Sequence, residues 1–161
     1  MEIPESMAEE LGAWNNGRGI GLEDWIGCEG RFALAVGYAA AFWPAIHLVE
    51  GYLITSDDGP PDPEHILTWE HGEGATRDGV EAVCNHLHIV DLHAVGCADA
   101  SSDKLEALGE VLREMWAAKL ALQFPNRSCR VAFRHPDDPM DLEGYVLSFW
   151  QIANEGVPCR P

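Results

Sequence analysis

Basic residues are scarce in this sequence. Ten Lys and Arg stand against 27 Asp and Glu, which gives a formal net charge of −17 over 161 residues. The imbalance is uneven, because residues 1–100 hold 18 acids and three bases (net −15), while residues 101–161 hold nine acids and seven bases (net −2). Nucleic-acid binding relies on basic stripes that release counterions from phosphates, and no run of Lys and Arg here can form one. We therefore expect no nucleic-acid partner.

Long hydrophobic runs are also absent. The longest apolar segment, residues 32–46, is interrupted by Gly37 and Pro44 and is shorter than the ~18 apolar residues that cross a bilayer. The first ten residues have neither the basic nor the apolar region of a signal peptide. We expect a cytoplasmic protein with no membrane partner.

Several chemical motifs are missing. The chain has no Cys-x-x-Cys pair, and its odd number of cysteines argues against a disulfide framework. The five are Cys28, Cys84, Cys97, Cys129 and Cys159. We expect most of them to be buried as small hydrophobic residues, with Cys159 the most exposed thiol. There is no P-loop or nucleophile elbow either, and we expect no cofactor.

The remaining composition, 47% hydrophobic and 23% charged, is typical of a soluble globular domain, and no internal repeat divides the chain. Residues 1–161 are therefore predicted to form one domain. Helical periodicity and capping residues predict helices near residues 31–42, 77–90 and 103–123. Strand composition and alternation predict strands near residues 46–54, 129–134 and 144–152. The predicted fold class is α+β, with a small, mainly antiparallel sheet packed by helices.

Residues 77–93 allow two interpretations. As a helix, the segment has an apolar arc that leaves Glu81 and Asn85 outside it. As a strand, its apolar alternation is brief. We favour the helix, continuing to about Val90.

The same segment carries side chains that ligate metals: His86, His88, Asp91 and His93. The string superficially resembles the His-x-His-x-Asp-His motif of metallo-β-lactamase-like hydrolases, with one extra residue before Asp91 and another before His93. Neither helical nor strand spacing brings three of these side chains to one point. We favour hydrogen-bonded or surface histidines, and keep metal binding as the alternative.

A cysteine nucleophile is a second catalytic alternative. Cys28 lies just before the predicted helix at residues 31–42, where the helix dipole favours a thiolate. A base such as His47 would also have to lie close by. The interpretation we favour is a buried cysteine at a corner between two helices.

One tryptophan lies in a polar, acidic stretch and is predicted to be exposed. An exposed tryptophan with an acidic rim is typical of a contact site for a basic protein. The predicted partner-binding residues are Trp69, Glu70, Glu73, Asp57 and Asp58.

These features favour a non-enzymatic interaction module that presents an acidic face to a basic partner, as inhibitor- or immunity-type proteins do. One alternative is a small hydrolase that uses the His86–His93 segment as a metal site or Cys28 as a nucleophile. Another is a structural or oligomeric protein without a site, and a large exposed apolar patch would support it. The sequence does not fix the oligomeric state.

Overall fold

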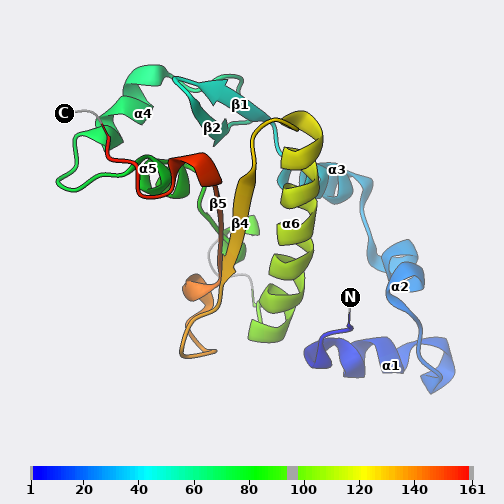
Figure 1. The fold of residues 1–161 in the computed structure, drawn as a ribbon. Coiled ribbons are helices and arrows are strands. Elements are labelled where there is room, and N and C mark those ends of the chain that lie inside the picture. The colour runs from blue at the N-terminus through cyan, green and yellow to red at the C-terminus, as the bar shows by residue number, and fades with distance from the viewer. Residues whose placement is uncertain (1, 94–97, 160–161) are drawn as a thin grey trace.

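The structure is a computed structural model that describes residues 2–93 and 98–159. Its α-helices are α1 (Ala8–Gly17), α2 (Leu22–Glu29), α3 (Phe32–Phe42), α4 (Pro63–Glu70), α5 (Arg77–Cys84) and α6 (Ser102–Gln123). Its strands are β1 (Ile46–Val49), β2 (Tyr52–Thr55), β3 (Leu87–His88), β4 (Cys129–Arg134) and β5 (Val146–Gln151). Short 3₁₀ helices are η1 (Glu5–Met7), η2 (Ile89–Leu92), η3 (Leu142–Gly144) and η4 (Ile152–Asn154). The strands form two small antiparallel sheets, so the predicted α+β class is confirmed (Figure 1).

The segment predicted as one strand at residues 46–54 is a tight hairpin. Strand β1 pairs with β2, and Val49 lies opposite Tyr52. The two residues between the strands, Glu50 and Gly51, have φ angles of 50° and 85°. Two-residue hairpin turns of this kind require positive φ at both positions, and glycine accepts that conformation without strain. The single strand is therefore a wrong prediction, because an apolar run does not reveal where it reverses.

The second sheet has the order β3-β5-β4. The predicted hairpin between its two longer strands is confirmed, with Cys129 opposite Gln151 and Arg134 opposite Val146. Strand β5 begins at Val146 rather than at residue 144, because η3 occupies the preceding residues. One face of this sheet packs against α6, and we call the opposite face the outer face.

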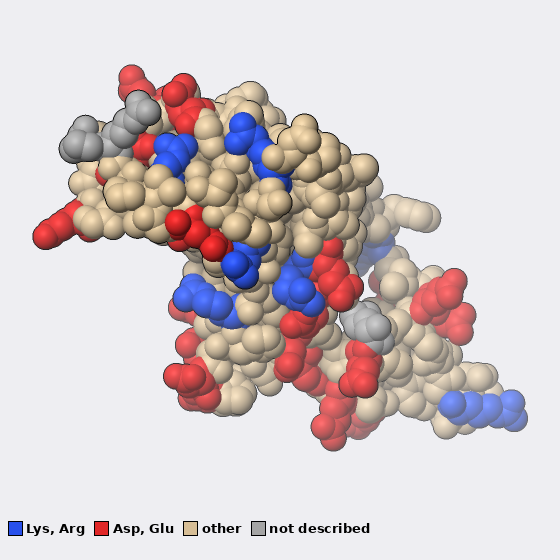
Figure 2. Space-filling view, viewed as in Figure 1, with Lys and Arg blue, Asp and Glu red and all other residues tan. Residues whose placement is uncertain are grey.

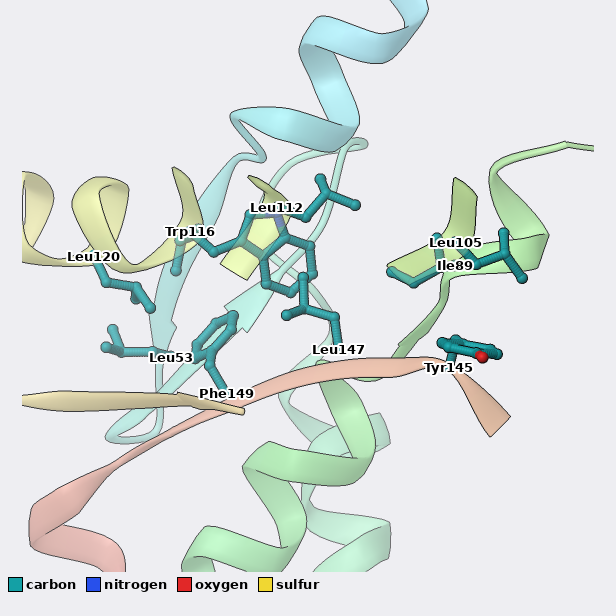
Figure 3. Packing of buried hydrophobic residues seen from close by; sticks show 10 residues of the cluster. Leu53, Ile89, Leu105, Leu112, Trp116, Leu120, Tyr145, Leu147 and Phe149 are labelled. Carbon is teal, nitrogen blue, oxygen red and sulfur yellow. The ribbon is translucent and has the colours of Figure 1, made fainter. Parts of the chain in front are cut away.

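The main hydrophobic core lies between α6 and the inner face of β5 (Figure 3). The Trp116 and Phe149 rings meet edge to face, with centroids 5.8 Å apart. Gly109 of α6 allows the Phe133 ring to pack directly on the helix, since a Cβ at that position would lie 2.1 Å from the ring. The helix predicted at 103–123 is confirmed with nearly the same bounds. A second cluster, under α4 and α5, contains Val49, Tyr52, Ile54, Ile66 and Val80.

Helix α5 ends at Cys84, well before the predicted residue 90. The Asn85 side chain donates to the Leu53 carbonyl at 2.8 Å and accepts from the Thr55 amide at 2.9 Å. These bonds fix Asn85 against the edge of β2, and the chain then turns to pair Leu87 with Leu147 of β5. The longer helix is a wrong prediction, because tertiary hydrogen bonds outweigh the local apolar period.

Glu81 of α5 is fully buried between the two sheets. Its carboxylate accepts backbone N–H bonds from Leu53 at 2.9 Å and Gln151 at 2.8 Å. The side-chain amides of Gln151 and Asn154 donate to it as well, at 2.5 and 2.9 Å. A buried carboxylate is tolerated when donors satisfy its oxygens. Because these donors come from both β2 and β5, Glu81 joins the two sheets.

Residues 2–43 form an arm that extends away from the rest of the described chain (Figure 1). We call that remainder, residues 44–93 and 98–159, the body. The bond from Ser6 N to Asp103 Oδ2, at 2.8 Å, fixes the start of the arm to α6. Near its end, Trp116 Nε1 donates to the Ala41 carbonyl at 2.9 Å. The helix predicted near 31–42 is confirmed as α3, but it lies mostly in solvent.

Candidate functional site

The predicted metal ligands do not converge. The imidazoles of His86 and His88 lie together, with ring centroids 5.3 Å apart. Asp91 is exposed on η2, and His93 Nε2 is hydrogen-bonded to the Tyr38 hydroxyl of α3 at 2.5 Å. Across residues 2–93 and 98–159, no three His, Cys, Asp or Glu side chains are placed to hold a metal ion. Of the predicted set, the structure therefore brings only the His86–His88 pair together.

The cysteines differ from expectation. Cys28 is exposed rather than buried, and it lies in the last turn of α2, four residues before α3 begins. Cys159, expected to be the most exposed thiol, packs against the second hydrophobic cluster. Burial raises the pKa of the Cys84 thiol and raises that of Cys129 to about 11. Cys97 lies outside the described residues.

Trp69 and its acidic neighbours are partly where they were predicted. The Trp69 side chain is 47% exposed, and Glu73 lines the same shallow hollow of about 250 Å³. Glu70, in contrast, turns inward and accepts a hydrogen bond from the buried hydroxyl of Tyr52, with Arg77 3.7 Å away. Burial and this bond raise the pKa of Tyr52. Glu70 therefore belongs to an internal polar cluster.

The other two predicted contact residues lie in the loop after β2. Asp57 lines a separate hollow with Gly37 of α3 and Trp116 of α6. Asp58 is exposed next to it in sequence. The five predicted residues thus do not surround Trp69 as one rim.

A hollow of about 540 Å³ between the N-terminal segment and α6 is acidic. Its apolar lining comes from Ile3, Pro4, Ala107 and Val111. Its carboxylates are those of Glu2, Glu5, Asp103, Glu106, Glu110 and Glu114. Arg113 pairs with Glu110 at 2.8 Å, so part of this charge is neutralised. Figure 2 shows acidic groups crowded over the lower part of α6, next to the N-terminus.

An apolar stripe runs along α3 and continues to Trp43. Residues 32–42 contain no charged side chain, and α3 has no buried residue. Phe32, Val36 and Trp43 are 92%, 72% and 41% exposed, and Ala39 is exposed between them. The spacing of Phe32, Val36 and Ala39 places them on one side of α3. Trp43, four residues further on, directly follows the helix, and Lys119 Nζ lies 5.1 Å from the centre of its ring. We call these four residues the α3 stripe.

The arm around the α3 stripe is acidic. It holds seven carboxylates against Arg18 and Arg31, a net side-chain charge of −5. In the helix before the stripe, Ile26 is 61% exposed on a segment that also carries Glu23 and Glu29. Apolar and acidic side chains are thus presented together.

The sequence predicted a helix near residues 31–42 but not that this helix would be exposed. The available signal was the absence of any polar side for solvent, since an amphipathic helix on a core has one apolar and one polar face. Despite this apolar character, none of the helices in the described ranges is both long and apolar enough to cross a membrane.

Comparison with known proteins identifies no relative. The sequence matches no protein-family model, and neither the curated proteins nor the solved structures contain a match to it.

Proposed function

We propose that this chain is a non-catalytic interaction module whose arm docks on a basic protein partner. The observation that carries the proposal is the α3 stripe, because its apolar side chains face water while the body has a complete core of its own. Removing apolar surface from water contributes a favourable free energy of about 25 cal/mol per Å². Contiguous exposed apolar surface is typical of a protein contact site.

The spacing of the stripe suits a helix that binds in a groove. Such helices present anchors at about i, i+4, i+7 and i+11 to an apolar groove of the partner. Phe32 provides the largest anchor because nearly its whole side chain is available. Gly37 and the alanines of α3 keep the rest of the helix thin, so a partner can approach its backbone.

Charge defines the chemistry of the partner. An arm of net charge −5 favours a groove edged by Lys and Arg, and the acidic hollow beside α6 supports the same preference. A second copy of this chain would bring an equally acidic arm, which opposes self-association. We therefore propose that the partner is a different, basic protein, as the composition of the chain suggested. This partner would bind at the α3 stripe and not at the surface around Trp69.

Site-specific photo-crosslinking in the cells that express the chain tests this proposal. A photoreactive residue replaces Phe32 or Val36, and in the control it replaces Met140, which is 81% exposed in the β4–β5 loop. We expect one discrete crosslinked product from positions 32 and 36 that is absent from position 140, and a partner with a net positive charge.

Two results would overturn the proposal. Products that contain only this chain would show that a second copy covers the stripe, as in the oligomeric alternative. The same pattern of products at all three positions, or no product at any, would show that the stripe is not a docking surface.

A further inference from the structure

The outer face of the three-stranded sheet holds a hollow of about 470 Å³, far from the α3 stripe in sequence and independent of the proposed arm function. In the strand register, His88, Val146 and Arg134 form one row across β3, β5 and β4. Ser148 and Ala132 form the next row. The remaining lining residues are Ala82, Val83, His86 and Trp150. The walls are therefore mainly apolar, with the two imidazoles at one end and the Arg134 guanidinium at the other.

Two imidazoles are fixed at one end of this hollow. His86 Nδ1 donates to the Val83 carbonyl at 2.5 Å, and His88 Nδ1 donates to the Glu143 carbonyl at 2.6 Å. Because a carbonyl oxygen only accepts, Nδ1 carries the proton in both rings. Each Nε2 is then left for another group, and neither has a hydrogen-bond partner in the described parts of the chain.

The opposite end holds the Arg134 guanidinium, for which the described residues provide no counterion. Arg134 makes no ion pair with any carboxylate of the described residues, although the protein carries 27 acids. Arg130, four residues earlier on the same face of β4, donates from Nε to Glu155 at 2.7 Å. No described Asp or Glu lines the hollow. The Glu155 carboxylate, which accepts from Nε1 of the lining Trp150 at 3.0 Å, is paired with Arg130. An anion that enters the hollow therefore meets a cation in its lining.

We propose that this hollow binds a small, flat organic anion. Its acid group pairs with Arg134, because a guanidinium matches the geometry of a carboxylate. Its apolar body lies over Val146 and Ala132, beside Trp150. A polar hydrogen at its far end is donated to an imidazole Nε2. Neighbouring strands lie about 4.8 Å apart, so His88 and Arg134 are about 10 Å apart at the backbone, which suits a molecule of one ring.

Titration of the full chain with simple probes tests this site. The probes are benzoate, 4-hydroxybenzoate and inorganic phosphate. Binding of each probe is measured by NMR, through the side-chain ¹⁵N resonances of His86 and His88, and by calorimetry. We expect saturable binding of both benzoates, tighter for 4-hydroxybenzoate because its hydroxyl can donate to Nε2, and weaker binding of phosphate because it has no apolar body.

Three variants separate the site from nonspecific attraction. Arg134→Gln lowers the affinity for benzoate at least about tenfold, since hydrogen bonds to charged groups contribute about 1.5–3 kcal/mol. Arg130→Gln, the matched control, changes it less than about twofold because that side chain is already held by Glu155. His88→Gln weakens 4-hydroxybenzoate more than benzoate, which a merely structural role would not do.

The proposal is overturned by shifts that do not saturate, by equal effects of the two arginine variants, or by phosphate binding as tightly as benzoate. Binding of Zn²⁺ at His86 and His88 that excludes benzoate would also overturn it in favour of the metal alternative.

Discussion

The arm and the body differ in how they use apolar side chains. In residues 2–43 only Pro4 and Leu11 are buried, whereas every residue in the two hydrophobic clusters comes from the body, except Phe42 at their edge. Yet α3, in the arm, is entirely uncharged. Apolar composition therefore predicts a contact without saying whether that contact lies within the chain, and the difference between the two regions suggests that the contact of α3 lies outside it.

The sharpest test of this comparison substitutes one phenylalanine in each region. Phe149→Ala removes a fully buried ring from the body and should lower the free energy of unfolding by about 3–5 kcal/mol. Phe32→Ala removes a ring that is 92% exposed and should change it by less than about 0.5 kcal/mol. Urea unfolding followed by circular dichroism measures both. Similar losses in the two variants would mean that the arm is part of the folded core.

The buried carboxylate provides a second test of the body. Glu81→Ala leaves four donors without their acceptor, so we expect a loss of about 3–5 kcal/mol in the free energy of unfolding. Glu73→Ala, an exposed glutamate, is the control and should have almost no effect. A loss below about 1 kcal/mol for Glu81→Ala would contradict its role in joining the sheets.

A pair of helical glycines gives a smaller contrast. Gly109→Ala would place a methyl group against the Phe133 ring, and overpacking of this kind typically costs about 1–3 kcal/mol. Gly37→Ala in α3 meets no atom within 4 Å and should be neutral or slightly stabilising, because alanine favours helices by up to about 1 kcal/mol. Thermal unfolding of the two variants compares them, and destabilisation by Gly37→Ala would show that α3 is tightly packed within the chain.

The smallest expected effect concerns the attachment of the arm. Hydrogen bonds from Ser101 and Ser6 hold the pKa of the Asp103 carboxyl down at about 2, compared with 3.8 ordinarily. Since the folded-state pKa is lowered, its stabilisation is complete above about pH 4 and is lost as the pH falls through about 2. Its size is below about 1 kcal/mol because solvent screens the group.

The Ser6 amide resonance reports this attachment in an NMR titration. It should shift with a midpoint near pH 2, and Asp103→Asn should abolish that titration. A midpoint near pH 4 would mean that Ser6 and Asp103 are not bonded in solution.

Local patterns predicted much of the fold. Helix α6 and the β4–β5 hairpin follow from apolar periodicity and alternation, signals that are contained in the segment itself. The end of α5 and the burial of Glu81 did not follow, because their causes lie in the backbone of β2 and β5, more than 25 residues away. The reversal at Glu50–Gly51 was hidden inside an apolar run.

The candidate surfaces were less predictable than the fold. The exposure of Trp69 followed from its polar neighbours, but the inward turn of Glu70 depends on Tyr52 and Arg77 from other elements. The pairing of His86 with His88 follows from strand alternation, which the favoured helix obscured. Arg134 reaches their hollow only through the order of three strands, which no local pattern encodes.

Amide hydrogen exchange of the purified full chain, at two protein concentrations 100-fold apart, tests the central claim most directly. If the α3 stripe is uncovered in the free chain, the amides of residues 32–42 exchange much faster than those of residues 105–120, at the same rate at both concentrations. If the amides of residues 32–42 exchange slowly, and more slowly still at the higher protein concentration, the account is contradicted, because a second copy of the chain would then cover α3.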